Sequence, residues 1–121
     1  MIPSIMICDD SNIARKQLKK VLPESWKESV KLAHNGEEAL IGLRAEHFDI
    51  LFLDLTMPVL DGFDVLTTMK SEEIQVKTIV ISADIQIEAR NRVEAAGALD
   101  FIKKPVSSEA LIAVLTKHNL I

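Results

Sequence analysis

The sequence lacks the features of a secreted, membrane-spanning or nucleic-acid-binding protein. Cys8 is the only cysteine among 121 residues, which excludes a disulfide within the chain. No apolar run exceeds a few residues, whereas a membrane-spanning helix needs about 20, and no signal-peptide pattern is present. The basic pairs Arg15–Lys16 and Lys19–Lys20 are interpreted as one solvated helix face, and the net charge is −4. We therefore expect a cytoplasmic protein that binds no membrane and, by this chain alone, no nucleic acid.

The composition is that of a single globular domain. Hydrophobic residues make up 48% of the chain and charged residues 26%, and we expect residues 1–121 to form one domain. Cys8 ends an apolar run and is interpreted as a small buried hydrophobic residue rather than a nucleophile. His34, His47 and His118 have no metal-ligand spacing and are interpreted as surface residues, and Trp26 as a partly covered loop anchor.

Apolar runs of strand length alternate with segments of helical period. The spacing predicts strands at residues 5–8, 30–33, 50–53, 78–81 and 99–102. Helices are expected after each: one capped by Ser11 or Asn12, one capped by Asn35 with a capping-box-like Glu38, one over 63–70, a weak one over 85–96, and one capped by Ser107 or Ser108. Five such repeats predict an α/β fold, a doubly wound parallel sheet with helices on both faces.

Charged residues follow three of the predicted strands. Asp9 and Asp10 come after the first strand, Asp54 after the third and Lys104 after the fifth. The carboxyl ends of parallel strands meet at one edge, where open α/β folds place their chemistry. Three converging carboxylates repel one another unless a cation lies among them, and oxygen ligands suit Mg²⁺. We therefore predict a Mg²⁺ site, or a Mn²⁺ site, at this edge.

Asp54 is the best candidate nucleophile, because a rigid strand precedes it. A carboxylate can attack phosphorus to form an aspartyl phosphate, and such transfer depends on positioning and charge neutralisation. Asp10 and Asp54 are expected to bind the metal directly and Asp9 through a water. Lys104 and the hydroxyl of Ser82 are expected to hold phosphoryl oxygens.

The chain resembles, over essentially its whole length, the receiver domains of bacterial two-component response regulators, including the chemotaxis regulators. Each motif alone is weak, but their joint order and spacing are specific. The motifs are Asp9-Asp10-Ser11, Leu53-Asp54-Leu55-Thr56-Met57-Pro58 with Asp61-Gly62, Ile81-Ser82-Ala83 and Lys103-Lys104-Pro105.

The resemblance implies a flavodoxin-like strand order, 2-1-3-4-5, and a phosphoacceptor that is not a turnover enzyme. It implies that Asp54 is phosphorylated from the phosphohistidine of a histidine kinase or phosphotransfer protein. It also implies Mg²⁺ on Asp9, Asp10, Asp54 and the backbone carbonyl of Thr56. A cis peptide bond before Pro105 is implied as well.

The resemblance further implies a switch pair, Ser82 and Phe101, and a downstream protein target on the surface of helix 4, strand 5 and helix 5. The chain departs mildly from the family pattern at two positions. Ser82 occupies a position where threonine is commoner in the family, and Phe101 one where tyrosine is commoner. Because Phe101 has no hydroxyl, a switch through it must depend on packing alone. A simple cap for the following helix remains an alternative role for Ser82.

Three other functions are compatible with an acidic residue after a strand of an α/β fold. A haloacid-dehalogenase-type phosphatase needs a second acid two residues after its nucleophile, and that position holds Thr56. A flavin-mononucleotide binder needs a glycine-rich loop for phosphate, which Asp9 and Asp10 would repel. A non-phosphorylated pseudo-receiver that only binds proteins remains the alternative. A free-standing regulator is favoured over a receiver cut from a longer protein.

Overall fold

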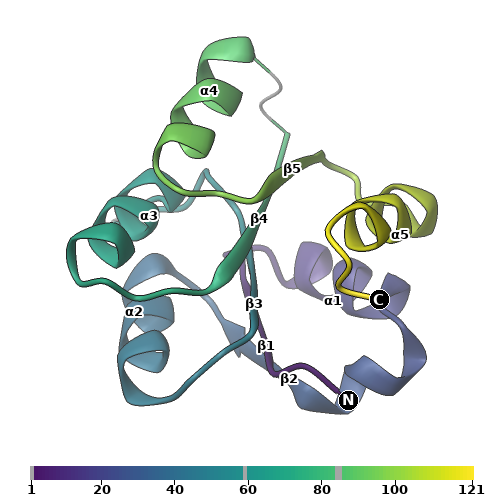
Figure 1. The fold of residues 1–121 in the computed structure, drawn as a ribbon. Helices are drawn as coiled ribbons and strands as arrows, with labels where there is room; N and C mark the ends of the chain where they lie inside the picture. The colour runs from purple at the N-terminus through teal and green to yellow at the C-terminus, as the bar shows by residue number, and fades with distance from the viewer. Residues whose placement is uncertain (1, 59, 84–85) are drawn as a thin grey trace.

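The computed structural model describes residues 2–58, 60–83 and 86–121, and in this part of the chain five strands form one parallel sheet (Figure 1). The strands are β1 (Ile5–Cys8), β2 (Val30–Ala33), β3 (Ile50–Leu53), β4 (Lys77–Ser82) and β5 (Asp100–Lys103). The helices are α1 (Asn12–Val21), α2 (Gly36–Ala45), α3 (Gly62–Ser71), α4 (Ile87–Ala95) and α5 (Ser108–Lys117), with a 3₁₀ helix η1 (Glu24–Ser29) before β2. The order β2-β1-β3-β4-β5 confirms the predicted doubly wound fold.

Helices cover both faces of the sheet. In Figure 1, α1 and α5 lie on one side of the strands, and α2, α3 and α4 lie on the other. Met6 and Cys8 of β1 belong to the hydrophobic cluster under α2 and α3, whereas Ile5 and Ile7 belong to the cluster under α1 and α5. Since both faces are covered, β1 and β3 are buried at every position. This burial explains why these strands are continuous apolar runs.

The strand register brings the polar residues that follow the strands to one edge. Cys8 lies opposite Leu53 in the β1–β3 pair, and Ser82 lies opposite Lys103 in the β4–β5 pair. The residues after these strand ends therefore leave the sheet at the same level. They include Asp9, Asp54 and Lys104.

The predicted helix caps are present at Ser11, Asn35 and Ser107. In each, the side-chain oxygen accepts a hydrogen bond from the backbone N–H three residues later. The box expected at Asn35 is shifted by one residue, because the Glu38 carboxylate accepts from the backbone N–H of His34. A complete capping box that was not predicted, Asp61 with Asp64, begins α3.

The predicted helix over 85–96 is shorter in the structure. Helix α4 spans Ile87–Ala95 and is preceded by Gln86, while the predicted first residue, Ile85, lies outside the described residues. Ser82 ends β4, and the N-cap of α4 is Gln86.

Trp26, predicted to be a partly covered loop anchor, and His118, predicted to be a surface residue, are both less exposed than expected. Trp26 is 5% exposed and packs in the cluster under α1 and α5, because η1 folds it inward instead of leaving it on a loop. His118 is also partly buried, with Nε2 at 2.8 Å from Oδ2 of Asp100. His34 and His47 are exposed as predicted. Among the described helices, none combines the length and apolar character needed to span a membrane.

Candidate functional site

Three carboxylates meet at the carboxyl edge of the sheet. Asp9, Asp10 and Asp54 each offer an oxygen, and these atoms lie within 4.8 Å of one another. Asp9 and Asp54 are buried, whereas Asp10 is exposed. The backbone N–H of Asp54 donates to the carbonyl of Cys8 at 3.0 Å, which extends the β1–β3 ladder by one residue and holds the acids side by side. The predicted convergence of the three acids is confirmed.

Lys104 joins this cluster from the end of β5. Its Nζ lies 2.7 Å from Oδ2 of Asp9 and 3.3 Å from Oδ1 of Asp54. Its backbone N–H donates to the carbonyl of Ser82 at 2.9 Å, which ties the loop after β5 to β4, and the Lys104–Pro105 peptide bond is cis. Burial lowers the pKa of Lys104, but its contacts with Asp9 and Asp54 outweigh burial and raise the pKa above its usual value.

The electrostatics of the cluster disfavour a second buried negative charge. Burial, followed by the neighbouring Asp9 carboxylate, raises the pKa of Asp54 to about 6, although Lys104 and the backbone N–H of Thr56 act in the opposite direction. One ammonium group therefore does not neutralise the site. A divalent cation would relieve this repulsion, and a donor set of carboxylate oxygens fits Mg²⁺ or Mn²⁺.

A cavity of about 410 Å³ reaches the acids from outside. Asp9, Asp54 and Lys104 line its floor together with β1 and β3, and Ile13, Gln17 and Val106 are among its other walls. A larger cavity of about 850 Å³, lined by Phe48 and Lys77 among others, contains none of the four charged groups of the site. The smaller cavity therefore lies directly against Asp9, Asp54 and Lys104.

Ser82 and Phe101 lie on the neighbouring strands β4 and β5. Ser82 is 1% exposed at the end of β4, and Phe101 is 8% exposed in β5, where it pairs with Val80. The guanidinium of Arg90, from α4, lies over the Phe101 ring at 5.5 Å from its centroid. This cation–π contact was not predicted, and it links the ring directly to α4.

Comparison with known proteins agrees with this geometry. The model of the response regulator receiver domain family matches residues 5–116. The chain belongs to this family. Receiver domains are signalling phosphoacceptors that bind Mg²⁺ at an acidic pocket and interact with histidine kinases and downstream effectors. In this chain the described group of carboxylates that could hold a metal ion is the cluster of Asp9, Asp10 and Asp54.

Relatives of this receiver differ in length. The chain is 32% identical to the chemotaxis protein CheY of Bacillus subtilis over 117 residues, which covers 97% of this chain and 98% of that protein. It is 35% identical over 109 residues to the response regulator MprA of Mycobacterium avium, covering 90% of this chain and 47% of MprA. The chain thus spans about half the length of several curated relatives that it matches.

Solved receiver structures have the same fold. A response regulator from Thermotoga maritima has a TM-score of 0.81 at 28% identity, covering 97% of both chains. The chemotaxis protein CheY4 of Vibrio cholerae has a TM-score of 0.84 at 25% identity, covering 97% of this chain and 98% of that one.

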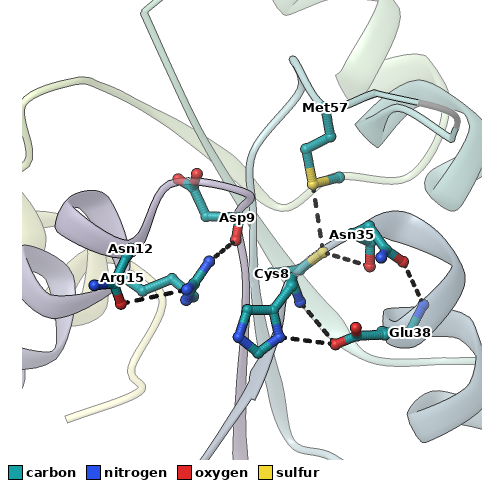
Figure 2. A network of polar contacts seen from close by, with 8 residues as sticks. Cys8, Asp9, Asn12, Arg15, Asn35, Glu38 and Met57 are labelled. Carbon is teal, nitrogen blue, oxygen red and sulfur yellow. Dashed lines mark hydrogen bonds and ion pairs between the residues drawn. The ribbon is translucent and has the colours of Figure 1, made fainter.

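Two groups of contacts in this receiver were missed by sequence reasoning. Cys8 was predicted to be buried and inert, and burial does raise the pKa of its thiol to about 12. Its Sγ also lies 3.4 Å from the carbonyl of Asn35 and 3.6 Å from Sδ of Met57 (Figure 2). Arg15 was assigned to a solvated helix face but is buried. Its spacing of three from Leu18, on the inner face of α1, is the signal that was available.

Proposed function

We propose that this chain is the phosphoacceptor of a two-component system, with Asp54 as the residue that is phosphorylated. The observation that carries the proposal is the meeting of Asp9, Asp10, Asp54 and Lys104 at one point of the sheet edge. The donor is the phosphohistidine of a histidine kinase or a phosphotransfer protein. The histidine ring approaches through the cavity of about 410 Å³ beside α1.

In the proposed transfer, a carboxylate oxygen of Asp54 forms a bond to phosphorus while the bond between phosphorus and the histidine nitrogen breaks. The electron pair of the broken bond stays on the histidine ring. Asp9, Asp10, Asp54 and the backbone carbonyl of Thr56 would hold Mg²⁺, which neutralises charge on the phosphoryl oxygens. Lys104 is 3.3 Å from Oδ1 of Asp54 and is therefore placed to bind an oxygen of the incoming group.

The alternative functions fit the site less well. Thr56, two residues after the nucleophile, cannot protonate a leaving group as a haloacid-dehalogenase-type acid would. A pseudo-receiver that only binds proteins needs no acid cluster. This chain has such a cluster, in which burial and the neighbouring Asp9 carboxylate raise the pKa of Asp54 and disfavour the metal-free fold.

A small phosphodonor tests the proposal without knowledge of the kinase. The wild-type protein, incubated with acetyl phosphate and Mg²⁺, is expected to gain the mass of one phosphoryl group, and the peptide that contains Asp54 is expected to carry it. With a chelator in place of Mg²⁺, no gain is expected. A protein that stays unmodified in Mg²⁺ would support the pseudo-receiver instead. A protein that is modified equally in chelator would contradict the proposed role of Mg²⁺.

We also propose that Ser82 and Phe101 transmit phosphorylation to the surface formed by α4, β5 and α5. The phosphoryl group would draw the Ser82 hydroxyl inward, and the Phe101 ring would move into the space behind it. Because Arg90 lies over that ring, ring movement would break this contact with α4. A differential interaction of a few kcal/mol is enough to shift such a two-state equilibrium.

Amide chemical shifts report this change directly. Addition of a beryllofluoride phosphoryl mimic with Mg²⁺ is expected to shift amides of Arg90, Lys103 and Ile112 as well as those of the site loops. If the shifts are confined to the loops around Asp10, Asp54 and Lys104, the domain transfers phosphate without changing the surface of α4, β5 and α5. The downstream protein target would then need another surface.

A further inference from the structure

Arg15 is a buried cation on a helix whose other basic residues are exposed. Arg15 is only 6% exposed, whereas Lys16, Lys19 and Lys20 of the same helix are exposed. Taking a guanidinium out of water is costly unless its donors find partners. The burial of Arg15 therefore requires specific hydrogen-bond partners for its guanidinium group.

The main contact of Arg15 is with the backbone of the acid pair. Its Nη1 donates to the carbonyl oxygen of Asp9 at 2.6 Å, while Nη2 reaches Oδ1 of Asn12 at a longer 3.4 Å. Nε is buried and, among the described residues, has no hydrogen-bond partner. Figure 2 shows the guanidinium meeting the Asp9 carbonyl while the Asp9 carboxylate points away from it. The arginine is thus aimed at the backbone of a site residue and not at its side chain.

This contact completes the fixation of Asp9. Its Oδ1 accepts from the backbone N–H of Ser11 at 2.9 Å, and its Oδ2 pairs with Lys104 at 2.7 Å. Its own N–H donates to the carbonyl of Ala33 at 3.1 Å. The carbonyl that Arg15 binds is the remaining polar group of Asp9. It is also part of the peptide unit that leads into Asp10.

Asp10 has no comparable fixation. In the part of the chain that the structure describes, no hydrogen bond or ion pair holds its exposed carboxylate. Its direction depends on the peptide plane between Asp9 and Asp10, because that plane sets where the Asp10 side chain leaves the backbone. The Arg15 hydrogen bond restrains that plane.

We propose that Arg15 is a positioning residue of the metal site, which orients the Asp10 carboxylate by holding the carbonyl of Asp9. The inference rests on the proposed function of the acid cluster. It makes a prediction of definite sign. A nearby positive charge repels Mg²⁺, so loss of the charge alone would strengthen binding. Loss of the Asp10 orientation would weaken Mg²⁺ binding. Residues that hold the ligands of a metal, without touching the metal themselves, typically contribute about 10-fold or more to its affinity.

Titration of the folded, ¹⁵N-labelled protein with MgCl₂, followed by amide chemical shifts, tests the proposal without any phosphodonor. Arg15→Met is expected to weaken Mg²⁺ binding about 10-fold. Arg15→Lys, which keeps one donor and the charge, is expected to recover part of the loss. Lys16→Met, the adjacent and exposed position, removes the same charge and is expected to bind Mg²⁺ as the wild type does or slightly more tightly.

Wild-type affinity or tighter binding in Arg15→Met would overturn the proposal, because Arg15 would then act only as a tie between α1 and β1. If the methionine variant does not fold, Arg15→Gln, whose shorter amide carries no charge, replaces it with the same expected weakening. Thermal melts in chelator identify the folded variants first. A wild-type protein that itself shows no Mg²⁺-dependent shifts at Asp9, Asp10 and Asp54 contradicts the proposed function instead. The two failures are therefore distinguishable.

Discussion

Asp54→Ala is expected to abolish the mass gain that acetyl phosphate and Mg²⁺ produce in the wild-type protein. Among the described carboxylates of the cluster, the variant loses the one that is buried and that we propose to attack phosphorus, and Asp10 is exposed. Asp9 is bound through both carboxylate oxygens, to Ser11 and to Lys104. Intact-mass measurement under the conditions used for the wild type checks this outcome.

A matched control separates the nucleophile from the general loss of a carboxylate. Glu109 is exposed in the first turn of α5 and is not one of the carboxylates of the acid cluster. Glu109→Gln is expected to gain the phosphoryl mass as the wild type does. Equal mass gain in Asp54→Ala and the wild type would move the phosphorylation site elsewhere and remove the basis of the proposed function.

The same aspartate has a predictable effect on stability in the absence of metal. The folded-state pKa of Asp54 is raised to about 6, against 3.8 for an ordinary aspartate. Because its pKa is raised, the Asp54 carboxyl stays protonated to a higher pH in the folded state than in the unfolded state. The cost to folding is therefore absent below about pH 4, grows as pH rises to about 6, and reaches about 3 kcal/mol above that.

Asp54→Asn keeps the shape of the side chain and removes this cost. In chelator at pH 7, it is expected to raise the melting temperature by on the order of 10 °C relative to the wild type. The difference is expected to vanish toward pH 4. Melting curves measured from pH 4 to 7 test the sign, and parallel pH dependences in the two proteins would show that burial of Asp54 carries no such penalty.

The strands and the acid cluster were predictable because they follow from local patterns. A parallel strand covered on both faces is a continuous apolar run, and β1 and β3 were found at the expected residues. The edge geometry of such a sheet then brings Asp9, Asp54 and Lys104 together without knowledge of any side-chain conformation. Helix α4 was placed less well, since only Ala89 and Val93 among its residues are buried and its pattern is correspondingly weak.

Contacts between side chains of different elements were not predictable. Lys104 was expected to bind a phosphoryl oxygen, and its contacts before phosphorylation were not predicted. In this structure its ammonium group is paired with Asp9 and Asp54. Arg15 was assigned to solvent because charged residues of helices are usually exposed. Both outcomes depend on side-chain conformations and on neighbours far apart in sequence, which periodicity does not report.

Lys104→Met is expected to slow phosphorylation of Asp54 by about 100-fold or more, because it removes a charged donor that meets the phosphoryl group in the transition state. Rates of mass gain with acetyl phosphate at saturating Mg²⁺ measure the effect. Lys103→Met is the matched control, since Lys103 is the preceding residue and is exposed. The control is expected to react at the wild-type rate.

The ion pairs of Lys104 predict a second, opposite effect. Its ammonium group lies 2.7 Å from Oδ2 of Asp9 and 3.3 Å from Oδ1 of Asp54, two residues of the proposed cation site. Lys104→Met is therefore expected to bind Mg²⁺ at least as tightly as the wild type, while its melting temperature in chelator falls because two buried carboxylates lose their counter-charge. Added Mg²⁺ should then stabilise the variant more than the wild type.

Two outcomes would contradict these predictions. If Lys104→Met is phosphorylated at the wild-type rate, Lys104 only ties β5 to the acid cluster. If Lys104→Met binds Mg²⁺ more weakly than the wild type, the lysine orders the metal site instead of competing with Mg²⁺ for it.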